Sequence, residues 1–210
     1  NLSHPAVFRF LPSGQLDVSF NGTGYRVIKL SATAYPNAIS LQSDGKILIG
    51  GEIRNTGNSD VFASRLTSSG LLDTGFGLNG IGTFDINGRG DYCNGIVVSS
   101  AGNVFLTGRT LNDDFYSDIF LIKLNSSGRK DNSFSQDGIV VTDINGYDDE
   151  AFGIALQTDG KIVVTGFSDD GNYIYRFTTV RYSSSGSLDP SFDQDGKVIS
   201  QIGNISSEAN

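Results

Sequence analysis

The chain has 210 residues, 38% hydrophobic and 18% charged, which is the balance of a globular protein and excludes an intrinsically disordered one. Its formal net charge of −8, with no run of Lys or Arg, argues against binding to nucleic acid or to an anionic membrane surface. No stretch approaches the ~18 apolar residues of a membrane span, so we expect no insertion into a bilayer.

One phrase occurs four times and defines an internal repeat. Its copies are SGQLDVSFNGTGY at 13–25, SGLLDTGFGLNGI at 69–81, SGRKDNSFSQDGI at 127–139 and SGSLDPSFDQDGK at 185–197. A second phrase lies between them, as AISLQSDGKILIGG at 38–51, GIVVSSAGNVFLTG at 95–108 and GIALQTDGKIVVTG at 153–166. Equivalent positions are 56 to 58 residues apart, which predicts one structural unit per period.

Each unit is predicted to hold four short strands, joined by turns in which Asp-Gly, Ser-Gly or Asn-Gly tolerates positive φ. In the second complete unit these strands are Gly95–Ser99, Asn103–Thr107, Phe120–Leu124 and Ile139–Thr142. In the third strand, Phe120, Ile122 and Leu124 share one face and Lys123 points the other way. We therefore expect this strand to be packed more heavily on one side.

Four strands in about 58 residues fit one β-propeller blade, slightly longer than the usual ~40–50 residues. We predict an all-β, β-propeller-like array of four-stranded antiparallel blades that stack and bury one another's faces. The single repeat domain, 1–210, is divided into a half unit at 1–30, complete units at 31–86, 87–144 and 145–203, and a tail at 204–210. We expect the chain to be a fragment of a longer parent, completed by further repeats or by a second copy of itself.

Residues repeated in every unit are assigned structural roles. Each repeated Phe is expected to fill the interface between neighbouring units. A basic residue stands eight positions before each repeated Asp, so we expect the two to pair across the hairpin or the Asp to cap the turn. The residues are Arg9, Asp17 and Phe20; Arg65, Asp73 and Phe76; Lys123, Asp131 and Phe134; and Arg181, Asp189 and Phe192.

The pattern F-x-x-R-L-x-x-S-G-x-L-D-x-x-F-x-x-x-G followed by A-I-x-x-Q-x-D-G-K-I-L-x-x-G resembles the delta-60 repeat family over nearly the whole chain. The chain departs from it at Ala101-Gly102-Asn103, where the pattern has Asp-Gly-Lys, and at Lys130, where it has Leu. The resemblance implies β-propeller-like blades and an extracellular or cell-surface setting in a bacterium. It implies no catalytic residues.

Function is expected in the loops that differ between units, because the repeated residues are scaffold. Aromatic rings beside carboxylates suit sugar binding, since a ring face stacks on a pyranose while acids accept hydrogen bonds from its hydroxyls. The predicted ligand-binding residues are Asp114, Phe115, Tyr116, Tyr147, Asp170, Tyr173 and Tyr175.

Two other patterns in these loops admit a plainer interpretation. Arg89-Gly90-Asp91 spells the tripeptide that integrins read, but Asp91 aligns with Asp149 of the next unit and fits a turn residue of the repeat. Calcium is the one candidate cofactor, because acidic residues crowd the loops. They are Asp113, Asp114, Asp118, Asp148, Asp149, Glu150, Asp169 and Asp170. No D-x-D-x-D-G order with a closing Glu is present, so we interpret them as solvated acidic loops without a bound metal.

An enzyme is not expected. His4 is the single histidine and Cys93 the single cysteine, which argues against catalytic triads, His-metal sites and an internal disulfide. Cys93 is expected to be half-buried in a loop. We predict a non-enzymatic adhesion or recognition module of a bacterial surface or fibre protein, meeting a glycan or protein on another surface. A purely structural repeat spacer is the alternative, and a two-carboxylate carbohydrate-active enzyme is the least favoured.

Overall fold

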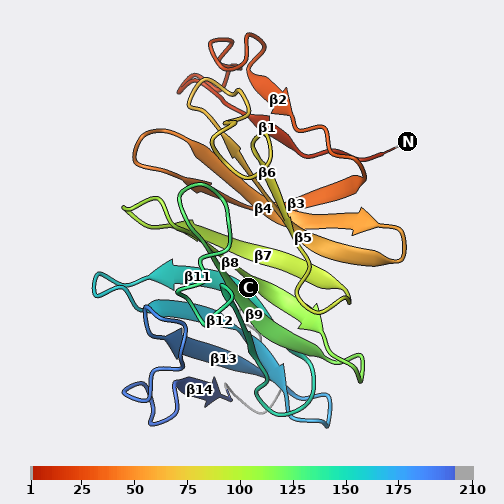
Figure 1. The fold of residues 1–210 in the computed structure, drawn as a ribbon, viewed down its shortest axis with the longest axis vertical. Helices are drawn as coiled ribbons and strands as arrows, with labels where there is room; N and C mark the ends of the chain where they lie inside the picture. The colour runs from red at the N-terminus through yellow and green to blue at the C-terminus, as the bar shows by residue number, and fades with distance from the viewer. Residues whose placement is uncertain (1, 202–210) are drawn as a thin grey trace.

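The computed structural model describes residues 2–201 as a stack of antiparallel β-sheets (Figure 1). A two-stranded sheet, β1 (Ala6–Phe8) and β2 (Tyr25–Val27), comes first. The next sheet holds β3 (Thr33–Leu41), β4 (Ile47–Asn55), β5 (Asn58–Leu66) and β6 (Ile81–Phe84). The third holds β7 (Asp91–Val98), β8 (Val104–Leu111), β9 (Ser117–Leu124) and β10 (Ile139–Thr142). The last holds β11 (Asp149–Leu156), β12 (Ile162–Asp169), β13 (Tyr175–Tyr182) and β14 (Lys197–Ser200).

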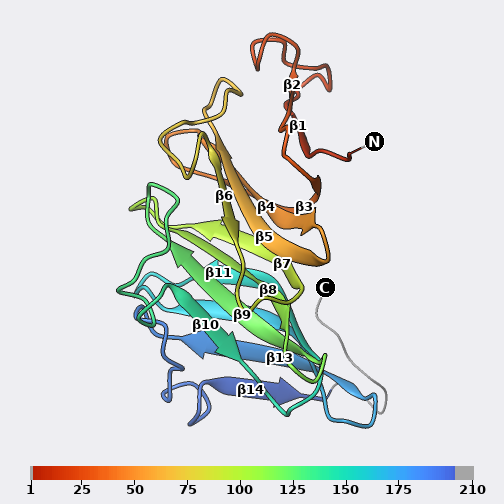
Figure 2. The same cartoon turned by 45° about the vertical axis from the view of Figure 1, so that its right-hand side comes forward.

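Every strand pairs with its neighbour in the chain, so each four-stranded sheet is a continuous meander. The sheets lie one above the other along the long axis, with β1–β2 at one end and β14 at the other (Figures 1 and 2). The first strands adjoin, since β7 contacts both β3 and β11. This arrangement confirms the predicted all-β, propeller-like fold. Residues 2–201 contain no helix, and so none that could span a bilayer.

The expectation that the third strand of a unit is packed mainly on one side is wrong. In β9, Phe120, Ile122 and Leu124 are buried in the cluster shared with the preceding sheet. Ile119 and Leu121 are equally buried in the cluster shared with the following sheet. Both faces of a middle blade are covered, because a neighbouring sheet stacks on each side.

In the second complete unit the first three strands are longer than predicted, and several residues assigned to loops lie in strands. The connection between the strands predicted at Asn103–Thr107 and Phe120–Leu124 shrinks to 112–116, because Leu111 pairs with Ser117 and Thr110 with Asp118. Cys93 is not half-buried in a loop but fully buried in β7. The hydrophobic pattern assigns these polar residues to loops, because it ends before the strands do. Backbone hydrogen bonds to the neighbouring strand keep them in the sheet.

The repeated Phe of one sheet packs against the turn glycine of the next. The pairs are Phe20 with Gly70, Phe76 with Gly128, and Phe134 with Gly186, and each ring is fully buried. A Cβ at Gly70, whose φ is +86°, would lie 2.9 Å from the Phe20 ring. Glycine is therefore required both by the left-handed backbone and by the ring that occupies its side-chain space. Phe192, in the last hairpin, is only partly buried.

The basic and acidic residues of the repeat meet, and the contact continues into the next sheet. Arg65 Nε donates to Asp73 Oδ2 at 2.8 Å, while Arg65 Nη1 donates to the carbonyl of Ser126 in the following hairpin at 2.7 Å. Asp73 Oδ1 also accepts from the Gly75 amide at 3.0 Å, so the carboxylate caps its own turn as well. The equivalent pairs Arg9–Asp17, Lys123–Asp131 and Arg181–Asp189 have separations of 2.8, 3.0 and 2.8 Å.

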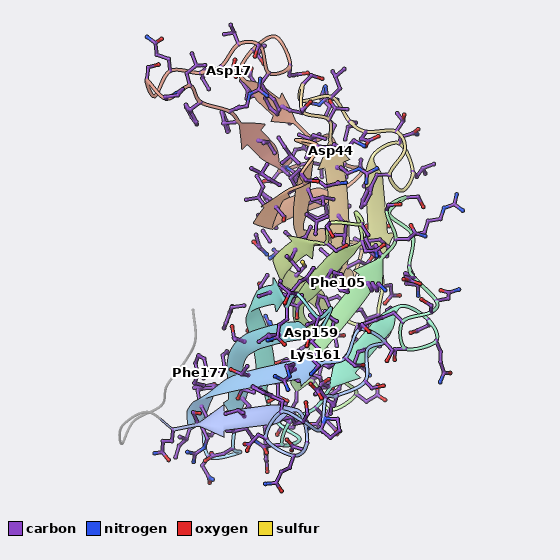
Figure 3. The ribbon with its side chains drawn as sticks, turned by 90° about the vertical axis from the view of Figure 1, so that its left-hand side faces the viewer. Asp17, Asp44, Phe105, Asp159, Lys161 and Phe177 are labelled. Atoms are coloured by element: carbon purple, nitrogen blue, oxygen red, sulfur yellow. The ribbon has the colours of Figure 1, made fainter. Side chains whose placement is uncertain are left out.

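The lysine of the Asp-Gly-Lys turn reaches the same repeated Asp. Lys161 Nζ lies 3.1 Å from Asp189, and Lys46 Nζ lies 3.3 Å from Asp73. Figure 3 labels Asp159 and Lys161 of one such turn. These contacts join the first hairpin of a blade to its last.

The first strand of each four-stranded blade, called the inner strand below, contains a β-bulge. Its pairing with the second strand shifts register at Pro36/Ala38, Cys93/Gly95 and Ala151/Gly153. At the bulge, Asn94 Nδ2 donates to the carbonyl of Ala151 on the next inner strand at 2.9 Å, and Asn37 bonds to β7 in the same way at 3.0 Å. A Cβ at Gly108, opposite the bulge, would lie 1.9 Å from the carbonyl oxygen of Tyr92. This explains the glycine that closes the second repeated phrase.

Replacing Gly70 by Ala should lower the free energy of unfolding by about 1–3 kcal/mol more than replacing Gly14 by Ala. Both turns have positive φ, +86° and +81°, so both variants carry similar backbone strain. Only at Gly70 does the new methyl group meet Phe20, since nothing lies within 4 Å of a Cβ at Gly14. Unfolding in urea measures the difference, and equal losses would contradict the Phe–Gly contact as a stabilising element.

Acidification should reveal the contribution of the repeated Asp. Hydrogen bonds from the Ser133 hydroxyl and then from Lys123 hold the pKa of Asp131 below its ordinary 3.8. A carboxyl with a lowered folded-state pKa stabilises the fold above the unfolded pKa, and the contribution disappears as the pH falls through the folded value. The free energy of unfolding should therefore decline below about pH 4, less steeply in Asp131→Asn. Identical slopes in urea titrations would show that this pair adds nothing.

Candidate functional site

The loops that differ between blades lie together at one edge of the stack. Strands alternate in direction, so the turns between second and third strands share an edge with the connections between sheets. These segments, 55–58, 85–91, 112–116, 143–149 and 169–175, are called the loop face below. The Asp-Gly-Lys turns, including Asp44 and Asp159 labelled in Figure 3, belong to the opposite edge.

A groove of about 620 Å³ lies on the loop face where the first two four-stranded sheets meet. Its lining includes Arg54, Asn55, Asn58, Arg89, Tyr92 and Phe115. The lining combines guanidinium and amide donors with two aromatic rings. No carboxylate belongs to it in the described part of the chain.

Phe115 has an unusual backbone at the mouth of this groove. Its turn has the hydrogen-bond pattern of the β7–β8 turn, in which Gly102 stands at the equivalent position. Phe115 nevertheless has φ +65°, where a side chain costs about 1–2 kcal/mol. The ring is 72% exposed, with the Arg89 guanidinium 4.9 Å from its centroid. Such strain at a large exposed ring is a recognised mark of functional positions.

Tyr116 and Tyr147 come together but mainly contact each other. Their rings meet edge to face with centroids 5.4 Å apart. Tyr147 also occupies the space beside Gly171, where a Cβ would lie 2.4 Å from the ring. These two predicted binding residues therefore pack the boundary between the second and third blades. Asp114 is exposed on the same turn as Phe115.

The remaining predicted residues form a separate group at the third blade. Asp170 accepts a hydrogen bond from Arg176 Nη2 at 2.7 Å, which holds its own loop together. Tyr175 lies in β13, edge-on to Phe167 at 4.9 Å. Tyr173 is 83% exposed with φ +59°. The seven predicted residues thus do not form one site, and only Phe115 lines the groove.

The integrin interpretation of Arg89-Gly90-Asp91 is wrong. Asp91 is fully buried, with Oδ2 accepting from the Ile86 amide at 2.9 Å and Oδ1 accepting from Thr110 Oγ1 at 2.6 Å. A receptor cannot reach a carboxylate in this position. The interpretation of Asp91 as a repeated residue of the connection agrees with these bonds.

Two clusters of carboxylates on the loop face were missed by sequence reasoning. They are Asp60, Asp85 and Asp91, called cluster 1, and Asp118, Asp143 and Asp149, called cluster 2. In each, one oxygen from every carboxylate lies within 4.8 Å of the others. Burial, with smaller effects of the neighbouring carboxylates, raises the pKa of Asp149 to about 8 and that of Asp91 to about 6.

Of the eight acidic residues that the sequence analysis interprets as solvated loop acids, Asp118, Asp149 and Asp169 are buried in strands, so that interpretation is wrong for these three. The strands extend further than the hydrophobic pattern does. A signal was present in the sequence. The motif D-I-N-G-x-x-D occurs at 85–91 and at 143–149, and Asp60 and Asp118 are also 58 residues apart.

Two family models match segments of the chain. One, described as "Domain of unknown function (DUF5122) beta-propeller", matches residues 42–76 and 157–192. Another, described as "Beta-propeller repeat", matches residues 80–116. A comparison with curated proteins gives no match. The matched segments fall in all three four-stranded sheets, and they agree with those sheets in indicating β-propeller-like repeats.

Proposed function

We propose that the chain is a non-enzymatic recognition module of a bacterial surface or fibre protein, and that the groove on its loop face binds a glycan. The observation that carries the proposal is the exposed ring of Phe115, which stands on strained backbone where the first blade has Gly57 and the β7–β8 turn has Gly102. A position that served only the turn would favour glycine, since glycine has no penalty at positive φ.

The chemistry of the groove suits a polyhydroxylated ligand. Phe115 is exposed, and the Arg89 guanidinium lies over its ring. The exposed part of the ring can therefore stack on a sugar ring. Asn55 and Asn58 supply amide groups that both donate and accept hydrogen bonds. Glycoside hydrolysis by the usual mechanism needs a pair of carboxylates, and the described lining of the groove offers none. The resemblance to delta-60 repeats supports the bacterial surface setting.

A purely structural spacer is the second candidate, favoured by the apolar end of the stack. Phe8 and Tyr25 on the two-stranded sheet and Phe10 just beyond β1 are exposed, with ring centroids 6.5 Å apart for Phe8 and Phe10 and 5.6 Å apart for Phe8 and Tyr25. In repeat proteins such a face is covered by the next unit. A second copy of the chain or a further repeat would cover it, and this role requires no ligand.

Phe115→Gly separates the two candidates. Glycine keeps the turn geometry and removes the ring, so glycan binding should weaken about tenfold or more, which corresponds to ~1.4 kcal/mol. The melting temperature should stay equal or rise, because the backbone strain is relieved. A glycan array identifies the ligand, and titration of the best glycan by saturation-transfer NMR or calorimetry measures the loss.

Tyr25→Ala is the matched control, because it removes an exposed ring from the two-stranded sheet, and Tyr25 does not line the groove. It should leave glycan affinity unchanged. No binding by the wild-type chain across a diverse array would favour the spacer. Equal affinities of Phe115→Gly and wild type would place the ligand outside this groove.

A further inference from the structure

We propose that cluster 2 is a divalent-cation site that binds one calcium-sized ion between neighbouring blades. In cluster 2, Asp118 comes from β9, Asp143 follows β10 of the same sheet, and Asp149 begins β11 of the next sheet. The ion would therefore connect two sheets at the loop face. Cluster 1 repeats this arrangement one blade earlier, with Asp60, Asp85 and Asp91, and serves as the comparison.

The clusters bring like charges together without a counter-ion. The β9–β10 register pairs Ile119 with Thr142, so Asp118 and Asp143 are the next residues to face each other across the two strands. Carboxylates in this position repel each other. No Lys or Arg of residues 2–201 forms an ion pair with any of the six carboxylates. Lys197 Nζ approaches cluster 2 but donates to the backbone carbonyl of Asp143, at 2.9 Å.

An unpartnered buried oxygen points to a missing ligand in cluster 2. Asp149 is fully buried, and its Oδ2 accepts from the Ile144 amide at 2.7 Å. Its Oδ1 has no hydrogen-bond partner. In cluster 1, the corresponding oxygen of Asp91 is satisfied by Thr110. The residue equivalent to Thr110 is Ser168, whose hydroxyl bonds to Thr178 instead, at 2.7 Å. A cation beside Asp118 and Asp143 would satisfy the free oxygen.

The connecting loops hold the exposed acid of each cluster in place. The Gly146 amide donates to Asp143 Oδ1 at 2.6 Å, and the Gly88 amide donates to Asp85 Oδ1 at the same distance. The D-I-N-G sequence thus fixes one carboxylate oxygen in both loops. Asp85 and Asp143 are exposed, which provides an entry path for an ion from solvent.

The ligand chemistry indicates calcium rather than a transition metal. All identified ligand groups are carboxylates, which are hard oxygen donors, and neither His nor Cys belongs to a cluster. Calcium accepts irregular geometry and completes its shell with water, whereas magnesium requires a near-ideal octahedron. The ligands come from three strand ends of two blades and not from one loop. This is why the site lacks the D-x-D-x-D-G order.

Calorimetry and thermal melting of the chain, treated with EDTA and then titrated with CaCl2, test the proposal. We expect one ion at cluster 2 and a higher melting temperature with calcium. Asp149→Asn should abolish binding of this ion, whereas Asp91→Asn should keep it. Because Asn removes the repulsion, the EDTA-treated Asp149→Asn variant should melt at or above the EDTA-treated wild type, which also shows that it folds.

Asp137→Asn is the matched control, an exposed acid in a turn at the opposite edge, and it should keep the ion. If Asp149→Asn fails to fold, the exposed Asp143→Asn gives the same readout. Absence of any calcium heat and of any melting shift in the wild type would overturn the proposal. So would a full calcium response in Asp149→Asn. Tighter binding of MgCl2 than of CaCl2 would overturn the assignment to a calcium-sized ion.

Discussion

The packing of a buried Phe ring against the turn glycine of the next blade is the constraint on which the rest of the structure depends. A four-stranded sheet cannot bury both of its faces alone, so each blade is stable only beside another. The ring of Phe76 fills the space where Gly128 would carry a side chain, which fixes the distance and register of the two sheets. Contact between blades therefore needs a Phe ring from one repeat and a turn glycine, which leaves room for that ring, from the next.

Two further contacts connect the same two blades. The guanidinium of Arg65 extends from its own hairpin to the carbonyl of Ser126 in the next hairpin. At the first strands, Asn37 at the bulge donates to the carbonyl of Cys93. Each contact uses a side chain of one unit and a backbone group of the next. The backbone partner is present whatever the sequence of the neighbouring unit, so the array tolerates variation between units.

This division leaves the loop face free to differ between blades. The turn that carries Phe115 has the same hydrogen bonds as glycine turns elsewhere, yet it presents a large ring to solvent. The carboxylate clusters show the opposite behaviour, because they are repeated features on the variable edge. Asp91 and Asp149 stand at equivalent positions, but only Asp91 has a hydroxyl donor for its second oxygen. The loop face thus combines individual recognition residues with a repeated polar junction between sheets.

The sequence by itself determined the all-β class, the period, the hairpins and the residues that join blades, because these depend on local turn chemistry and on repetition. Prediction from the sequence was wrong for residues whose environment depends on where the strands end and on which sheets stack against them. Asp118 and Asp149 read as solvated loop acids, and Tyr116 and Tyr147 as separate binding residues, until the fold placed each beside its neighbour. Residues from different blades meet only when the sheets stack, and no local sequence pattern specifies how far apart such residues lie. Tertiary structure alone therefore decided that Phe115 lines a groove and that three acids from two sheets converge.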